Sequence, residues 1–510
     1  MKKRTLLLLL LIVLSVGQAN AQRILTIEKA IELSFTGSPD LQKAALNLER
    51  YQELLNAQEA SMKSQFSFNV TPASYQNSRN FDAVYSQWYT SESFSTSGTF
   101  SIEQPIVWTG TTISLNNKFG WQQSTSQITG QEATTNTAFS NSLYLSLSQP
   151  LFTYNSMKME LEEIEMDYEN ALISYALTRL SLEQSITEQF YSVYTSQNSL
   201  AIAIEELEND QQNYDIIVEK VNLDISPRSE LFQAELNLAT SKSSVESSMV
   251  SLETNKDNLK IALGLPLSED IVVEADLGDI TVYINLEKAI ENALSTRLEL
   301  RQREMTNKEL EFSLITTKDN GKFQGSLSAS IGIMGDDSQF TNIYESPTQS
   351  PSVMLTFSVP IFDWGERRSR IRAQELSIES GKIDTEQELI DIEKDIRQVC
   401  RNIQNQITQI EIAKQSLENA QLTYDLNVEK YRSGEINGME MSEFQSQLST
   451  QKSTLLSCYV NMKTQLLNLR IISLYDFEKD EPISPLSMYS VETYQEYEKY
   501  KKQQEEKKLK

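Results

Sequence analysis

A run of sequence without proline between Glu366 and Tyr431 most constrains what this chain can fold into. Apolar residues recur in it at alternating spacings of three and four, which is a heptad seam. These residues are Leu389, Ile392, Ile396, Val399, Ile403, Ile410, Ala413, Leu417, Ala420 and Tyr424. The run therefore predicts one helix, about 100 Å long, that packs against other helices. Gly434 and Gly438 follow it and predict a tight reversal into a helix over 439–475.

Two other stretches of the chain have a period of two instead. Apolar residues alternate with Ser, Thr and Asn over 65–151 and again within 323–361. Pro150 and Pro360 end the alternation in each stretch, at the predicted joins between strand and helix. Few charges interrupt the pattern, so it fits a transmembrane β-barrel with apolar side chains outward and small polar ones inward. A soluble β-sandwich shares this composition and stays open as an alternative.

The tryptophans favour the membrane interpretation. Trp88, Trp108, Trp121 and Trp364 are the only four in the chain, and all fall at the predicted ends of strands. Interfacial girdles of membrane barrels place tryptophan in this way.

The first 21 residues have the features of a secretory signal. Three basic residues, Lys2, Lys3 and Arg4, precede an apolar stretch, and Ala19-Asn20-Ala21 suits cleavage. A transmembrane anchor is the alternative, which the shortness of the apolar stretch disfavours. No cysteine follows the cleavage site, so we expect no lipid anchor. Beyond residue 21 no apolar run approaches the roughly 18 residues of a membrane helix, so a membrane role would need a barrel.

Charge and residue usage exclude several classes of function. The formal net charge is −26, which argues against nucleic acid or an anionic lipid surface as partner. Histidine is absent, which removes the commonest catalytic base and metal ligand. Carboxylate pairs of the glycosidase kind stay possible, but none stands in a strand-end cleft pattern. We therefore expect no enzyme activity and no cofactor. Cys400 and Cys458 form no metal motif and read as buried structural thiols.

The chain also repeats itself. Helices are predicted over 26–63, where Pro39 would kink or break the helix near its start, and over 157–221, 228–263 and 285–318. Thr26-Ile-Glu-Lys-Ala-Ile-Glu32 matches Asn285-Leu-Glu-Lys-Ala-Ile-Glu291 at an offset of 259, whereas Pro150 matches Pro360 at an offset of 210. The first half therefore carries 49 extra residues, which include alternating segments at 94–104 and 113–121. The predicted organisation is a first repeat over 22–263, a connecting equatorial segment over 264–284, a second repeat over 285–475 and a polar tail over 476–510.

The predicted fold is mainly α-helical with a transmembrane β-barrel, built from a two-fold repeat of long coiled-coil hairpins plus strands. Neither the strands nor the helices close a core in one copy, so we expect closure by rotational symmetry. At this point the chain resembles the TolC-like outer-membrane efflux proteins over about residues 26–475. The motifs that carry the resemblance are Gln149-Pro150-Leu151-Phe152, Val359-Pro360-Ile361-Phe362, and Tyr431-x-x-Gly434 followed by Phe444-Gln-Ser-Gln-Leu448.

The resemblance implies a homotrimer in the cell outer membrane, with an α-helical tunnel in the periplasm. It implies docking to a periplasmic adaptor (membrane fusion) protein and to an inner-membrane pump of the resistance-nodulation-division or ATP-binding cassette type. The function would be that of a passive duct in tripartite efflux or type I secretion, which exports small molecules or proteins. The alternative without the resemblance is a periplasm-spanning coiled-coil tether or adhesin stalk, which does not explain six alternating segments.

The resemblance also implies roles for individual residues. Glu440 and Glu443 stand where family members ring the closed periplasmic gate with acidic residues, although a solvated helix face is the simpler interpretation. Asn222, Asp224, Arg432 and Gly434 would form the tips that dock the adaptor. The 49 extra residues exceed the family's usual strand pair. We expect them to add a membrane hairpin with a turn at Trp108-Thr109-Gly110, for eighteen strands per trimer, or else a hairpin above a twelve-stranded barrel.

Overall fold

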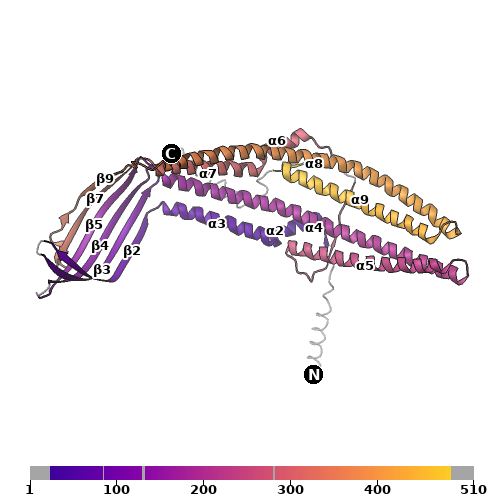
Figure 1. The fold of residues 1–510 in the computed structure, drawn as a ribbon, viewed down its shortest axis with the longest axis horizontal. Coiled ribbons are helices and arrows are strands. Elements are labelled where there is room, and N and C mark those ends of the chain that lie inside the picture. The colour runs from indigo at the N-terminus through magenta and orange to yellow at the C-terminus, as the bar shows by residue number, and fades with distance from the viewer. Residues whose placement is uncertain (1–22, 84–85, 129–131, 279–281, 484–510) are drawn as a thin grey trace, which may run out of the picture. The chain divides into compact units, whose positions relative to one another are not determined.

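The computed structural model describes residues 23–83, 86–128, 132–278 and 282–483 (Figure 1). The predicted signal segment and all but the start of the predicted tail lie outside these residues. The chain divides into two compact units. The strand unit comprises Glu49–Ala171 and Arg303–Asp384, and the helical unit comprises the described residues of Met1–Leu48, Leu172–Gln302 and Thr385–Lys510.

The strand unit contains one antiparallel sheet in the order β2-β3-β4-β5-β7-β9 (Figure 1). The bounds of its strands are β2 (Gln65–Asp82), β3 (Gln87–Ile106), β4 (Thr111–Ile128), β5 (Thr134–Leu151), β7 (Gln324–Asp337) and β9 (Ser352–Ser358), with a two-residue strand β8 (Thr348–Gln349) also on β7. The alternating segments of the sequence are all strands, as predicted. The segment around 94–104 and 113–121 is the hairpin β3–β4. The hairpin pairs with β2 on one side and with β5 on the other, so it forms part of the sheet and is not a separate hairpin above the sheet.

Four of these strands continue directly into helices. The helix α3 (Pro39–Ser61) leads into β2, and β5 leads into α4 (Ser156–Asn222). The helix α7 (Leu298–Asn320) leads into β7, and β9 leads into α8 (Glu366–Ser433). Within the strand unit α3 contacts α4 through Gln58 and Glu160. Next, α4 contacts α7 through an ion pair between Glu162 and Lys308, and α7 contacts α8 through Gln374.

The helical unit contains the remaining parts of α4 and α8, the helices α2 (Ile27–Gly37), α5 (Arg228–Leu263), α6 (Leu286–Thr296) and α9 (Gly438–Ser473), and two small sheets. One core lies among α2, α4 and α5 and includes Phe190 and Leu259. The other lies among α6, α8 and α9 and includes Ile396 and Met462. The predicted heptad seam is confirmed from Ile392 to Ala420, because its members there are buried or half-buried. Among the described residues, no helix offers a stretch both apolar and long enough to cross a membrane.

Several predicted bounds are wrong. The single helix expected over 285–318 is two helices, because the backbone of Arg297 is extended and ends α6. The strand β1 (Arg23–Leu25) was not predicted, and it pairs in parallel with β6 (Ile271–Val273). The helix expected to reach residue 475 ends at Ser473, where Leu474 adopts a left-handed conformation. Tyr475 and Asp476 then form β10, which pairs with β11 (Glu481–Pro482), so the chain is ordered beyond the expected start of the tail.

Helix lengths recur along the chain. The helices α2 and α6 each have 11 residues, α3 and α7 each have 23, and α5 and α9 each have 36. The first residues of α5 and α9 are Arg228 and Gly438, an offset of 210. This offset equals the one between Pro150 and Pro360 in the sequence.

Candidate functional site

The register of the sheet separates two chemically different faces. One row across five strands is apolar and consists of Phe66, Ile102, Leu115, Leu145 and Ile331. The next row runs across all six strands and consists of Gln65, Glu103, Ser114, Ser146, Ser330 and Ser352. Since successive residues of a strand point to opposite faces, the two rows lie on opposite faces of the sheet.

The apolar face is broadly exposed. Phe66 has 67% of its surface exposed and Ile331 has 63%, and both edge strands carry further exposed apolar side chains such as Phe68 and Val353. A contiguous apolar surface of this extent marks an interaction with lipid or protein. The opposite face carries small hydroxyl side chains, and the hydroxyl oxygens of Ser114 and Ser146 lie 2.6 Å apart across β4 and β5.

The tryptophans do not all lie at strand ends. Trp88 is the second residue of β3, Trp108 lies in the turn between β3 and β4, and Trp364 lies between β9 and α8. Trp121, in contrast, lies inside β4, where its ring meets that of Phe94 at a centroid distance of 5.9 Å. The prediction was wrong for Trp121 because β4 continues to Ile128, through a segment rich in Gln, Ser and Thr that the alternation of apolar residues did not mark.

The strand-to-helix joins contain exposed aromatic residues whose backbone has a positive φ. Pro150 is the penultimate residue of β5, and Pro360 follows the end of β9. Shortly after each proline an aromatic residue has a positive φ, 62° at Phe152 and 56° at Trp364. The ring of Phe152 lies 5.2 Å from that of Phe323, which stacks on Phe357 at 5.3 Å. Strain at such positions persists only where the surrounding structure holds it, so the joins are built features.

The two helical tips share one turn geometry. In the turn after α4, Ile225 donates its N–H to the carbonyl of Lys220 at 2.8 Å, and Asp224 has a φ of 58°. In the turn after α8, Glu435 donates to the carbonyl of Lys430 at 2.9 Å, and Gly434 has a φ of 82°. The side chains of Asn222, Asp224 and Arg432 are exposed.

Within the helical unit the two tips contact each other. The hydroxyl of Tyr431 donates a hydrogen bond to the side-chain oxygen of Asn213, and the ammonium of Lys220 lies 4.9 Å from the centre of the Tyr431 ring. The predicted tip residues did not include Leu223 and Ile225, which are 69% and 68% exposed. Two apolar residues in an otherwise polar turn are the sequence signal that could have identified them.

The structure places Glu440 and Glu443 on the first turns of α9, both exposed. Glu440 has a local partner, because its carboxylate accepts the N–H of Asn437 at 3.0 Å and Asn437 accepts the N–H of Glu440 at 3.0 Å. This reciprocal pair is a capping box, which stabilises the start of a helix. Glu440 thus has a structural role whether or not it also faces a pore.

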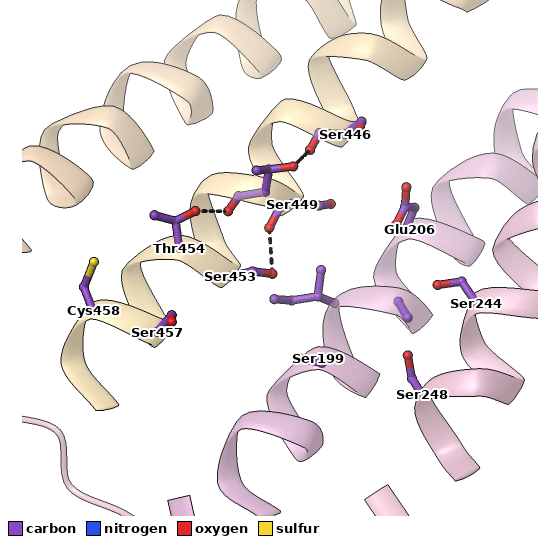
Figure 2. A pocket seen from close by; sticks show the side chains of 13 residues that line it. Ser199, Glu206, Ser244, Ser248, Ser446, Ser449, Ser453, Thr454, Ser457 and Cys458 are labelled. Carbon is purple, nitrogen blue, oxygen red and sulfur yellow. Dashed lines mark hydrogen bonds between the residues drawn. The ribbon is translucent and has the colours of Figure 1, made fainter. Parts of the chain in front are cut away.

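A hydroxyl-lined groove of about 590 Å³ lies between α9 and the pair α4 and α5 (Figure 2). On α9 it is lined by Ser446, Ser449, Thr450, Ser453, Thr454 and Ser457. Glu206 of α4 lines the opposite side, and burial raises its pKa, as does the nearby Asp210. Asp210 is itself buried, and the hydroxyl of Ser241 on α5 donates to its carboxylate. Burial raises the pKa of Asp210, and the hydrogen bond from Ser241 opposes that rise.

Comparisons with known proteins agree with this architecture. Residues 322–473 match the family model described as outer membrane efflux protein. The probable outer membrane lipoprotein SilC of Salmonella typhimurium is 18% identical over 329 residues, which cover 64% of this chain and 70% of the relative.

Two solved channels have the same fold. The Campylobacter jejuni CmeC outer membrane channel matches with a TM-score of 0.67 and 14% identity, over 90% of this chain and 86% of CmeC. The structure of CusC, described in connection with folding and transmembrane channel formation, matches with a TM-score of 0.64 and 15% identity, over 88% of this chain and 91% of CusC. The predicted resemblance is therefore confirmed: residues 322–473 match the outer membrane efflux protein family, and the chain has the fold of the TolC-like outer-membrane channels.

Proposed function

We propose that this protein is the passive outer-membrane duct of a tripartite efflux or type I secretion system. The observation that carries the proposal is the separation of the sheet into an apolar face and a hydroxyl-lined face. In a membrane barrel the apolar face contacts lipid and the polar face lines a water-filled channel, so each face of this sheet would have a function. A periplasmic tether or adhesin stalk has no use for such a sheet.

The free edges of the sheet support assembly from several copies. Within the described residues β2 pairs only with β3, and β9 pairs only with β7. An unpaired strand edge is a template for another strand. Six antiparallel strands leave the two edge strands running in opposite directions, so β9 of one copy can pair antiparallel with β2 of the next. A homotrimer would close such a barrel with eighteen strands.

The spacing of two tryptophans supports a membrane position for this barrel. Trp108 lies in the turn at one end of β4, and Trp121 lies ten residues beyond Thr111, the first residue of that strand. Ten residues of a strand tilted by about 40° rise roughly 25 Å, which is the height of the apolar band of a membrane barrel. Trp108 would then lie at the periplasmic interface and Trp121 at the outer one.

The helical unit would project into the periplasm. There the tips with Asn222, Asp224, Arg432 and Gly434 would meet a periplasmic adaptor, which links the duct to an inner-membrane pump. Glu440 and Glu443 would ring the closed aperture, six carboxylates in a trimer. The recurrence of helix lengths supports a duplicated origin of the two halves, each a hairpin of coiled-coil helices.

Expression in a Gram-negative strain that lacks its own duct tests the proposal. We expect a heat-modifiable trimer in the outer-membrane fraction and restored resistance to compounds that the host pump exports. A soluble periplasmic protein that extracts without detergent would contradict the proposal.

A further inference from the structure

The two free edges of the sheet have stretches of equal length. The strand β9 has seven residues, and β2 also pairs regularly over seven residues, Gln65–Thr71, before its ladder with β3 becomes irregular. At that point Pro72 and Ala73 together stand against Thr96 of β3, which is a β-bulge. Every residue of β9 and of Gln65–Thr71 is exposed, and within the described residues neither stretch has a partner on its outer side.

The ladder determines which backbone groups point out of each edge. In an antiparallel pair, residues that exchange hydrogen bonds with the partner strand alternate with residues whose N–H and C=O point away from it. Just before β9, Ser350 donates its N–H to the carbonyl of Gly332 on β7 at 2.9 Å. Counted from this bond through the continuous registers of the sheet, the residues with outward backbone groups are Val353, Leu355 and Phe357 on β9 and Phe66, Phe68 and Val70 on β2. The hydroxyl of Thr96 donates to the carbonyl of Thr71, which agrees with an inward direction for Thr71.

These outward residues also lie on the apolar face of the sheet. Phe66 belongs to the apolar row that contains Ile331, and Val353 faces Ala329, two residues from Ile331 on the same strand. If β9 of one copy pairs with β2 of the next, the apolar faces of the two copies must continue into each other. A shift of one residue would turn one of them over, so the allowed registers differ by steps of two.

Two prolines distinguish between these registers. Pro72 follows the regular stretch of β2, and Pro351 precedes β9. By the same alternation each stands at an outward position, where proline has no N–H to donate. When Ser352 lies opposite Thr71, the two prolines face each other just beyond the ladder. The three outward residues of each edge then face one another, with Val353 opposite Val70, Leu355 opposite Phe68 and Phe357 opposite Phe66. A slip of two residues either way moves one of these pairs off the end and brings a proline into the ladder.

The strand tilt that this register implies is that of a membrane barrel. Ser352 shares a row with Gln65 of its own copy and would face Thr71 of the next copy, six residues further along β2. Six residues span roughly 20 Å along a strand, and six strands span roughly 29 Å across the sheet. The ratio gives a tilt of about 35°, within the range of membrane barrels. With Ser352 opposite Asn69 the tilt would fall to about 25°, outside that range.

From the matched edges, the two prolines and this tilt we infer that β9 of one copy pairs with β2 of the next in this one register, and that Pro72 and Pro351 end the pairing on the side away from the helices. The inference rests on the proposed duct of several copies. The bulge after Thr71 bends the rest of β2, so Ser74–Asp82 stays an open edge in the assembly. Neighbouring copies are therefore joined over seven residues, and the hairpin β2–β3 extends beyond the joined part of the wall.

A disulfide across the junction tests the register. Met354 and Asn69 would face each other as a non-hydrogen-bonded pair, with about 4.5 Å between their Cα atoms. That separation lies within the reach of a disulfide. In a Cys400→Ser/Cys458→Ser background, we expect oxidation of Met354→Cys with Asn69→Cys to give a covalently linked trimer on a denaturing gel without reductant.

Two further cysteine pairs are the matched controls. Met354→Cys with Thr71→Cys and Met354→Cys with Ser67→Cys correspond to slips of two residues in either direction. In the inferred register their sites lie about 8 Å apart on the diagonal, so both variants should run as monomers. Preferential linkage of either control pair would overturn the register, as would a detergent-resistant oligomer in which no pair links. If the parent protein extracted from the outer membrane is monomeric, the proposed duct itself is wrong.

Hydrogen exchange of the unaltered assembly tests the end of the pairing without any cysteine. In the inferred junction the amides of 65–71 are bonded on both sides of β2, whereas alternate amides of Ser74–Asp82 stay open. We therefore expect peptides from 65–71 to exchange at least about tenfold more slowly than peptides from 74–82. The strand β3 pairs on both sides along the same levels, so its two halves should exchange alike. Equal exchange in the two halves of β2 would overturn the inference.

Discussion

The buried carboxylate of Asp210 on α4 accepts a hydrogen bond from the hydroxyl of Ser241 on α5. This contact joins the two helices close to the hydroxyl-lined groove. The Asp210 carboxylate loses hydration there, and one hydroxyl replaces little of it. The pair therefore introduces a pH-sensitive contact into the helical unit.

We expect Asp210→Asn to raise stability at neutral pH, by on the order of 1 kcal/mol. Burial raises the pKa of Asp210, so the ionised form costs stability that the protonated form does not. The contribution of this group is most favourable below the ordinary carboxyl pKa and falls as the pH rises through the raised one. Thermal unfolding followed by circular dichroism from acidic to neutral pH measures the effect. Asp215→Asn, exposed on the same helix, is the control, and an equal effect there would refute the prediction.

Replacing Glu440 and Glu443 with glutamine should weaken cation selectivity and block by trivalent cations in planar bilayers. Six carboxylates in one constriction attract cations, and glutamine removes the charge but keeps the shape. Glutamine also serves at the third position of a capping box, so the start of α9 should remain intact. Asn437→Ala is the matched control, because it breaks the capping box without changing charge. A double variant that conducts, selects and blocks like the parent would show that both residues are ordinary solvated side chains.

Gly37→Ala should destabilise the protein by about 1–3 kcal/mol through overpacking. A Cβ at Gly37 would lie 2.1 Å from the carbonyl oxygen of Leu263, where the ends of α2 and α5 meet. The backbone cannot move aside easily, because Gly264 at that contact has a φ of 70° and lies close to Gly37 in turn. Gly98→Ala is the control, since its Cβ would make only ordinary contacts with Phe68. Equal thermal stability of the two variants would contradict the expectation.

Cys400 and Cys458 should remain unlinked in the oxidised protein. Both are free thiols, and the carbonyl of Cys458 accepts a hydrogen bond from Gln406 at 3.1 Å. That contact places Cys458 opposite Gln406, six residues or about 9 Å along α8 from Cys400. Disulfides need Cα atoms within about 7 Å. Burial raises the pKa of the Cys400 thiol, so its alkylation at mildly alkaline pH should be slow. A linked peptide in mass spectrometry would refute the prediction.

Thr109→Cys should resist an impermeant maleimide added to intact cells. Thr109 lies in the β3–β4 turn, at the end of the sheet where the helices begin, and this end would face the periplasm in the proposed duct. Ser86→Cys, at the turn before β3 and thus at the opposite end of the sheet, should be labelled under the same conditions. Labelling of Thr109→Cys from outside would place the turn on the wrong side of the membrane.

Local periodicity determined most of the elements. The heptad seam from Ile392 to Ala420 and the alternation around Phe66 and Leu145 report which side of a helix or strand is buried, and that information lies within a few residues. The helix α8, the six main strands of the sheet and the reversals at both tips could therefore be predicted. Short local motifs, such as Gln149-Pro150-Leu151-Phe152, carried the resemblance to the TolC-like proteins. The bounds failed where a strand became polar, as beyond Trp121, or where one extended residue, Arg297, interrupted a helical pattern.

Contacts between residues far apart in sequence were decided only by the tertiary structure. The pairing of β1 with β6 joins segments almost 250 residues apart, and nothing in three residues at Arg23–Leu25 specifies that partner. The position of the β3–β4 hairpin inside the sheet depends on register with both β2 and β5. The capping box gave Glu440 a second role that its charge alone did not indicate. Sequence periods encode which face of an element is buried, whereas partners and register depend on shape complementarity between distant elements, which no local pattern contains.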